Sequence, residues 1–256
     1  MPVTPHIVTL HSYRGGTGKS TTAANVASLA AAAGHRVAVI DTDIQTPGLH
    51  RFFRLGGLST CRSLADYLVG NCEIGDAAGS VPVGDSGGGL YVVPARSRIN
   101  EVNEILMRGY DIGLLREGFD GLVEELGLDL VFLDTHSGMG NETLAAVAMS
   151  TSLLVITRAD HLTSEVRENI SVARRLGHPS VSVVINMVPA GITQDSVTGR
   201  AEQFYQSPVI ATMPYSAELA ALGSDGLLVR DNPGHELVSA YQDVTARILA
   251  GAGLAG

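Results

Sequence analysis

The chain has 256 residues, 45% of which are hydrophobic, and it carries a formal net charge of −9. This length and composition predict one large α/β domain over residues 1–256 with a substantial buried core. The acidic balance, with basic residues scattered instead of clustered, disfavours unaided binding to nucleic acid or to an anionic membrane surface.

Short runs rich in Val, Ile and Leu alternate with helical patterns along the chain. The first run, 6–12, leads through a glycine-rich turn into an alanine-rich helix at 19–34, which ends at Gly34. Further buried strands are predicted at 36–43, 89–95, 128–135, 152–159, 180–187 and 208–214, and further helices at 101–126, 161–176 and 234–250. This alternation predicts an α/β fold with a single doubly wound, mostly parallel sheet and helices on both faces.

The two cysteines, Cys61 and Cys72, are eleven positions apart, with no C-x-x-C pair and no paired histidines. Neither a disulfide framework nor a metal site is therefore indicated by the cysteines. No apolar run approaches the roughly 18 residues that are needed to span a bilayer. We expect a cytoplasmic protein without an intrinsic membrane anchor.

The turn after the first strand reads R-G-G-T-G-K-S-T and contains Lys19, the only lysine among the seventeen basic residues. Between a strand and a helix, the backbone N–H groups of such a loop converge on phosphate oxygens at the positive end of the helix. Lys19 would bridge the β- and γ-phosphates, Ser20 would ligate Mg²⁺, and Thr21 would bond the α-phosphate. The predicted phosphate-binding residues are Gly15, Gly16, Thr17, Gly18, Lys19, Ser20 and Thr21. The alternative is a tight strand-to-helix turn that holds no ligand.

This loop closely resembles the deviant Walker A motif, K-G-G-x-G-K-S/T, of the ParA/MinD family of P-loop ATPases. The segments VAVIDTDIQTPGLHRFF, LVFLDTHSG and MPYSAELAALGSDGLLV resemble later motifs of that family, and they occur in the family's order over nearly the whole chain. The resemblance, which is to MinD-like members, implies a Mg²⁺-dependent ATPase that forms a homodimer when ATP is bound.

Three aspartates lie at the carboxyl ends of buried strands beside the predicted phosphate site. A charged carboxylate at such a place is unfavourable unless a cation or a water compensates it. Asp134 would hold Mg²⁺ through water, and Asp41 would support the metal shell. The resemblance implies that Asp43 positions the attacking water and that Gly138 offers an amide to the γ-phosphate. The alternative is that these aspartates cap the helices that follow them.

Asn186 ends a predicted strand, and the resemblance implies that its amide reads the adenine edge. The chain continues Asn-Met-Val-Pro and so lacks the Asn-Lys-x-Asp of guanine readers, which favours ATP over GTP. The alternative for Asn186 is that it satisfies loop backbone groups. Pro214 is expected to close the base pocket, and His136, where the family often has proline, is interpreted as a loop residue and not as a base.

Arg14 takes the place of the family's lysine that reaches across the dimer to the partner's nucleotide. An arginine keeps the charge and the reach and adds bidentate geometry toward phosphate, so we expect it to act as a finger from the other subunit. The alternative is that Arg14 pairs with a local carboxylate and that the protein is monomeric.

The motifs together predict an ATP-driven molecular switch that hydrolyses ATP slowly and positions or regulates an unidentified protein partner or cargo. The alternative is a nucleotide-binding scaffold with negligible turnover, and a metal-cluster carrier is disfavoured by the lack of paired cysteines. The last sixteen residues hold one basic residue, Arg247, so neither DNA binding nor membrane binding is expected. The densest basic stretch, Arg51, Arg54 and Arg62, is interpreted as a solvated face or a partner contact.

Overall fold

The computed structural model describes residues 5–55, 62–95, 105, 111–177 and 180–255. Cys61 and residues 101–104 and 106–110 of the helix predicted at 101–126 lie outside the described residues. The remaining predicted strands and helices fall within them.

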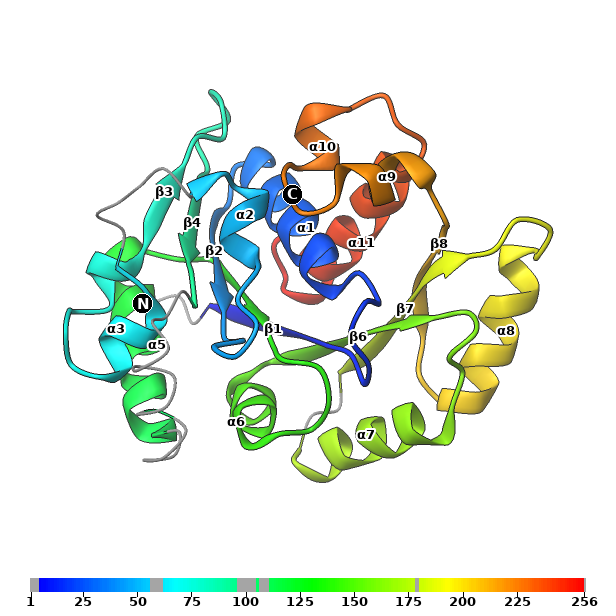
Figure 1. Cartoon of the computed structure of the whole chain (residues 1–256), viewed down its shortest axis with the longest axis horizontal. Helices are drawn as coiled ribbons and strands as arrows, with labels where there is room; N and C mark the ends of the chain where they lie inside the picture. The colour runs from blue at the N-terminus through cyan, green and yellow to red at the C-terminus, as the bar shows by residue number, and fades with distance from the viewer. Residues whose placement is uncertain (1–4, 56–61, 96–104, 106–110, 178–179, 256) are drawn as a thin grey trace.

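In the described residues, eight strands form one sheet in the order β3-β4-β2-β5-β1-β6-β7-β8 (Figure 1). They are β1 (His6–His11), β2 (Arg36–Asp41), β3 (Gly79–Val81), β4 (Gly89–Val93), β5 (Leu130–Asp134), β6 (Ser152–Arg158), β7 (Val181–Val188) and β8 (Val209–Pro214). Every neighbouring pair is parallel except β3 with β4. The prediction of a mostly parallel sheet is therefore confirmed, and β3 is a short antiparallel edge strand that the sequence did not predict.

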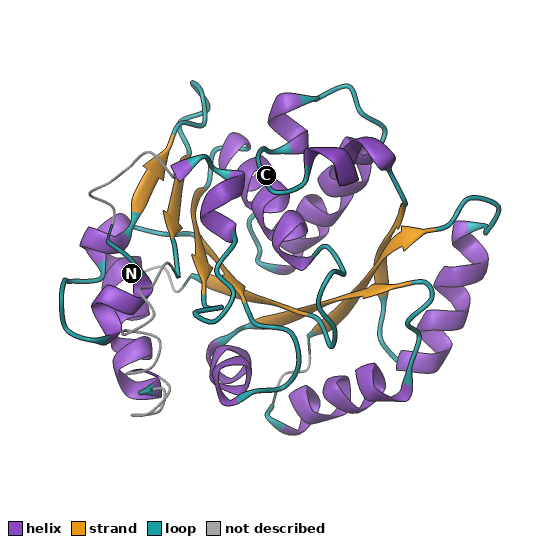
Figure 2. Ribbon diagram, viewed as in Figure 1, coloured by secondary structure: helices purple, strands orange, loops and turns teal. Residues whose placement is uncertain are grey.

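Helices cover both faces of the sheet, as predicted (Figure 2). On one face lie α1 (Lys19–Ala32), α2 (Leu49–Phe52), α9 (Ala217–Leu222), α10 (Leu228–Asp231) and α11 (Leu237–Gly251). On the other lie α3 (Leu64–Leu68), the short 3-10 helix η2 (Gly75–Ala77), α5 (Ile112–Leu126), α6 (Asn141–Met149), α7 (Ser164–Arg175) and α8 (Gln194–Tyr205).

Helix α1 lies against the middle of the sheet because its inward side chains are small. Ala23, Ala27 and Ala30 are fully buried and pack in one cluster with β-strand residues such as Leu10. Alanine favours the helix and lets the helix axis approach the sheet closely. The start of α1 is thereby fixed just beyond the end of β1.

The parallel strands bring their carboxyl ends to one edge of the sheet. Strand β1 lies between β5 and β6, with β2 and β4 beyond β5 and with β7 and β8 beyond β6. In open α/β sheets, ligands bind in a crevice at this edge. The crevice forms where the strand order reverses, with some strands added on one side of the first strand and the others on its other side. The predicted site residues lie at this edge, in the carboxyl ends of β2, β5, β7 and β8, in the loops after β1, β2 and β5, and in the first turn of α1.

Candidate nucleotide-binding site

The loop between β1 and α1 adopts a conformation that depends on glycine. Gly16 and Gly18 have φ angles of 73° and 87°, in the left-handed region that disfavours other residues. A Cβ atom on Gly18 would lie 2.3 Å from Nδ2 of Asn186. Gly18 caps α1 without any side-chain hydrogen bond, so the helix presents its positive end without a competing side-chain acceptor.

Two adjoining cavities meet at this loop. One of about 280 Å³ is lined by Ser12, Gly15, Gly16, Thr17, Gly18, Lys19, Ser20, Thr21, Asp43, Thr46 and Ser137. The other, of about 270 Å³, is lined by Gly16, Gly18, Thr21, Phe52, Asn186, Met187, Pro214, Tyr215, Ser216, Leu219, Ala220, Gly223 and Ser224. The structure thus brings the predicted phosphate-binding residues and Asp43 to one cavity, and the predicted base-binding residues Asn186 and Pro214 to the next.

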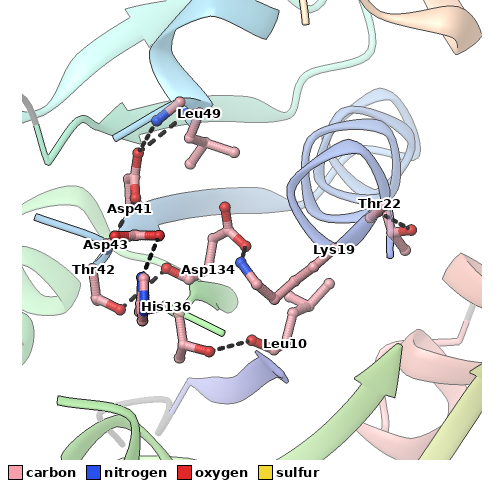
Figure 3. Close-up of polar contacts among 12 residues, drawn as sticks. Leu10, Lys19, Thr22, Asp41, Thr42, Asp43, Leu49, Asp134 and His136 are labelled. Carbon is pink, nitrogen blue, oxygen red and sulfur yellow. Dashed lines mark hydrogen bonds and ion pairs between the residues drawn. The ribbon is translucent and has the colours of Figure 1, made fainter. Parts of the chain in front are cut away.

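Lys19 and Asp134 form a buried ion pair at the floor of the site (Figure 3). The Nζ atom of Lys19 is 2.6 Å from Oδ1 of Asp134, and the two side chains are 9% and 2% exposed. Asp134 pairs in register with Asp41 on the neighbouring strand β2. Burial, and then the charge of Asp134, raise the pKa of Asp41. With its pKa raised to about 8, Asp41 is mostly protonated at neutral pH, and a cation bound nearby would favour its ionised form.

The Asp41 side chain also forms hydrogen bonds with the backbone of the loop that follows β2. Its carboxylate accepts hydrogen bonds from the backbone N–H groups of Asp43 at 3.0 Å and of Gly48 and Leu49 at 3.1 Å each. Leu49 is the first residue of α2. These contacts match the alternative in which the aspartate caps the next helix, and a place for Asp41 in a metal shell stays a prediction.

Asp43 lines the phosphate cavity and is held by three hydrogen bonds. Its Oδ1 accepts from the backbone N–H of Thr46 at 2.8 Å, and its Oδ2 accepts from the Thr46 hydroxyl at 2.7 Å. Nδ1 of His136 lies 3.0 Å from the same Oδ2. Burial alone would raise the pKa of Asp43, but these hydrogen bonds outweigh it, so the pKa lies below its usual value. Asp43 is therefore ionised at neutral pH.

The contact between His136 and Asp43 was not predicted, because His136 was interpreted only as a loop residue. The one signal in the sequence was its departure from the proline that the family often has at this position. That departure gave no indication that the ring reaches a loop 93 positions earlier in the chain.

Asn186 is 3% exposed, and its side chain binds backbone groups on both sides. Its Nδ2 donates to the carbonyl of Thr17 at 2.9 Å, and its Oδ1 accepts from the N–H of Met187 at 2.8 Å. Met187 has a positive φ of 55°. These contacts match the alternative that Asn186 satisfies loop backbone. The Asn186 amide still has one N–H on Nδ2 and one lone pair on Oδ1 for a further hydrogen bond. The adenine contact stays a prediction.

Gly138 and Arg14 line neither of the two cavities. The N–H of Gly138 donates to the carbonyl of Ser12 at 2.9 Å, so an interaction with the γ-phosphate requires that bond to open. The Arg14 side chain is exposed, and within the described part of the chain it forms no ion pair or hydrogen bond. Glu165, on α7, is a nearby carboxylate: hydrogen bonds from its own backbone and from Thr163 and Ser164 lower its pKa, and the charge of Arg14 is the smallest of the causes that lower it. The monomeric alternative therefore has a local carboxylate, although no direct ion pair joins it to Arg14.

The residues that are present fit a magnesium ion bound together with phosphate. Among the described residues, no group of three or more His, Cys, Asp or Glu side chains could hold a metal alone. Mg²⁺ does not need such a cage, because it keeps several waters and takes one or two protein ligands plus phosphate oxygens. Ser20 would be such a ligand, and Asp134 would hold the ion through one of its waters. Separately, no helix of the described residues is long and apolar enough to cross a bilayer.

A parallel sheet with a glycine-rich loop and a lysine at the start of the first helix defines a P-loop nucleotide-binding protein. A family model described as ParA: NUBPL iron-transfer P-loop NTPase matches residues 3–249. The chain belongs to this ParA/MinD family of P-loop NTPases, which confirms the resemblance drawn from its motifs.

Individual relatives differ in what they are described to do. The chain is 27% identical over 254 residues to an uncharacterized ATP-binding protein of Methanocaldococcus jannaschii, covering 94% of this chain and 87% of that one. It is 24% identical over 263 residues to an iron-sulfur cluster carrier protein of Aquifex aeolicus, covering 98% and 68%. The solved septum site-determining protein MinD from Pyrococcus horikoshii, complexed with Mg-ADP, has a TM-score of 0.81 at 18% identity, covering 99% of each chain. That likeness confirms the fold.

Proposed function

We propose that the chain is a MinD-like switch that binds ATP with Mg²⁺, hydrolyses it slowly, dimerises with ATP and positions or regulates a protein partner. We also propose that residues 1–256 form one P-loop ATPase domain. The observation that carries the proposal is the pair of adjoining cavities, which share Gly16, Gly18 and Thr21. One cavity holds the phosphate-binding side chains, and the other offers a pocket beside them for the base.

Each group of the site has a part in this cycle. The backbone amides of 15–19 and the ammonium of Lys19 would bind the phosphates, and Mg²⁺ would offset the charge of their oxygens. Asp43 would orient the attacking water by accepting a hydrogen bond from it. Because its pKa is lowered and it already accepts three hydrogen bonds, Asp43 is a weak proton acceptor. Slow hydrolysis is the expected result.

The exposed position of Arg14 beside the phosphate loop supports a contact across a dimer. Arg14 is exposed and makes no direct ion pair or hydrogen bond within the described residues, so its guanidinium is available to the phosphates of a second subunit. Because the loop lies at the open edge of the sheet, two copies that face each other would bring each Arg14 toward the partner's nucleotide. This contact would form only when both sites hold ATP.

The description of the family model and the Aquifex relative raise iron-sulfur cluster transfer as a second candidate function. Clusters are held by cysteine thiolates, usually several per cluster. This sequence has two cysteines, and burial, as the largest cause, raises the pKa of the Cys72 thiol to about 11. A thiol with so high a pKa is a poor ligand at neutral pH. We therefore favour the switch.

Phosphate release and equilibrium ATP binding, measured on the same preparations, test the proposal. We expect the wild-type protein to bind ATP and release phosphate slowly with Mg²⁺, and Lys19→Ala to lose both, because no second lysine can take its place. Arg116→Ala, which removes a 74% exposed cation on α5, is the matched control and should behave as wild type. ATP binding without phosphate release would favour the scaffold. Unchanged ATPase activity in Lys19→Ala would overturn the assignment.

A further inference from the structure

The backbone on either side of His136 is fixed to neighbouring elements. The hydroxyl of Thr135 donates to the carbonyl of Leu10 at 2.9 Å, and the N–H of Gly138 donates to the carbonyl of Ser12 at 2.9 Å. The hydroxyl of Thr143, on α6, lies 3.4 Å from the carbonyl of His136 itself. The loop after β5 is therefore attached to the end of β1 and to α6, and these bonds restrict the movement of the backbone that carries the imidazole ring.

From the loop after β5, the His136 ring extends toward the loop after β2 (Figure 3). Nδ1 of His136 is 3.0 Å from Oδ2 of Asp43. Asp43 lines the phosphate cavity, whereas His136 is not among the residues that line it. The histidine therefore contacts the carboxylate from outside the cavity and does not compete for the space that a nucleotide would fill.

The hydrogen-bond capacity of Asp43 fixes the direction of this contact. An ionised carboxylate only accepts hydrogen bonds, so Nδ1 of His136 must carry the hydrogen. Together with the two bonds from Thr46, three of about four acceptor positions on the carboxylate are filled. One acceptor position remains for a water molecule.

We propose that His136 is a positioning residue, which holds the Asp43 carboxylate so that its remaining acceptor position faces the attacking water. The proposal rests on the ATP hydrolysis proposed above. Thr46 alone would not fix this orientation relative to the phosphates, because it belongs to the same loop as Asp43 and moves with it. His136 belongs to the loop after β5 and connects the loop after β2 to the centre of the sheet.

Three substitutions separate this role from simple packing. His136→Ala removes the donor, and His136→Asn keeps an N–H donor at the place of Nδ1. His136→Gln moves the donor one bond further out, to the place of Nε2. We expect kcat to fall about 10- to 100-fold in His136→Ala with KM for ATP changed less than about twofold. His136→Asn should recover most of kcat, and His136→Gln should not.

Two further measurements make the test specific. In an Asp43→Asn background, His136→Ala should cause no additional loss, because the carboxylate that it positions is gone. In protein labelled with ¹⁵N-histidine, the His136 signal should show a ring protonated at Nδ1, independently of turnover. Thermal unfolding of each variant, with ATP binding at equilibrium, identifies those that are merely unfolded.

The outcomes distinguish this inference from the proposed function. A wild-type kcat in His136→Ala, equal losses in His136→Asn and His136→Ala, or a His136 ring protonated only at Nε2 would each overturn the positioning role while leaving the ATPase in place. A wild-type protein that binds ATP but releases no phosphate would overturn the proposed hydrolysis, and this inference with it.

Discussion

Lys19 illustrates how much of the site depends on a single side chain. As the only lysine, it supplies the ammonium that pairs with the buried Asp134 carboxylate. Removing one member of a buried pair leaves an uncompensated charge, which is strongly unfavourable. A nucleotide that binds here competes with Asp134 for the ammonium, and a cation near Asp134 would compensate that carboxylate. Binding of phosphate and of metal would thereby be coupled through one residue.

Another buried side chain near the loop makes folding sensitive to acid. His11, at the end of β1, is 1% exposed, and its Nδ1 has no hydrogen-bond partner. Burial, together with the nearby charge of Lys19, lowers its pKa from 6.5 to about 3. Below pH 6.5 the unfolded chain binds a proton that the folded chain does not, so stability is complete above that pH and declines as the pH falls toward 3.

The prediction is that His11→Phe reduces the acid sensitivity of the protein. In the wild type, His11 should account for a loss of about 2 kcal/mol in the free energy of unfolding between pH 8 and pH 5. Urea unfolding at the two pH values measures this loss in both proteins. His35→Gln, which removes a partly exposed histidine, is the control. An equal loss in His11→Phe and wild type would show that His11 is not the group responsible.

The sequence allows the positions of site residues to be predicted when those residues lie at the ends of strands or at the start of a helix. Lys19 and Asp43 were placed together because a loop after one strand and a carboxylate after another meet at the same edge of a parallel sheet. The bonds of His136 to Asp43 and of Asn186 to Thr17 join residues that are 93 and 169 positions apart in the chain. They depend on side-chain directions that only the folded chain defines, so no local pattern indicates them.

At the scale of elements, long apolar runs predicted seven strands of the sheet correctly. Strand β3 was missed because it has three residues, begins with glycine and lies at the sheet edge, where burial is incomplete. The arginines interpreted as a solvated face or a partner contact are exposed, and two of them also make ion pairs within the chain. Arg51 bonds Asp225 at 3.0 Å and Arg54 bonds Asp231 at 2.9 Å, which joins α2 to α10 and the loop before it. Both arginines are more than half exposed, so these pairs add little stability.

The phosphate loop gives a prediction at this scale, because its two left-handed glycines differ in their surroundings. Gly18→Ala would place a methyl group 2.3 Å from Asn186 Nδ2, whereas a Cβ on Gly16 would meet no atom within 4 Å. We expect Gly18→Ala to lower ATP affinity about tenfold more than Gly16→Ala, which adds only backbone strain. Calorimetric titration with ATP compares the two variants.

A double substitution identifies the cause of that difference. Adding Asn186→Ala to Gly18→Ala removes the atom that the new methyl group meets, so the two effects should be less than additive. Strictly additive losses would mean that the clash with Asn186 is not what weakens binding. The left-handed conformation of Gly18 would then carry the whole effect.

For the whole molecule, the open question is whether two copies face each other across their nucleotides. Asp43→Ala should bind ATP yet hydrolyse it poorly, and so accumulate a dimer. Arg14→Ala should bind ATP in its own loop but fail to form that dimer, because the contact that it loses belongs to the other subunit. The double variant should behave as Arg14→Ala does. Light scattering with and without ATP measures all three.

Arg116→Ala, on the far helix α5, controls for the loss of an exposed cation and should dimerise normally. If Asp43→Ala stays monomeric at saturating ATP, the dimer is absent and the scaffold alternative gains support. If Arg14→Ala dimerises as wild type does, the arginine acts within its own subunit or not at all.

The residues that line the two cavities extend from residue 12 to residue 224, and the wall of the base pocket is supplied after β8. During synthesis on a ribosome, the phosphate loop emerges early, but this wall is made near the end. If ATP binds as proposed, it adds its full binding energy only to a chain that has been made through residue 224. We expect a chain interrupted before residue 224 to lack that gain and to stay open to proteases, whereas ATP should protect a chain that includes this wall.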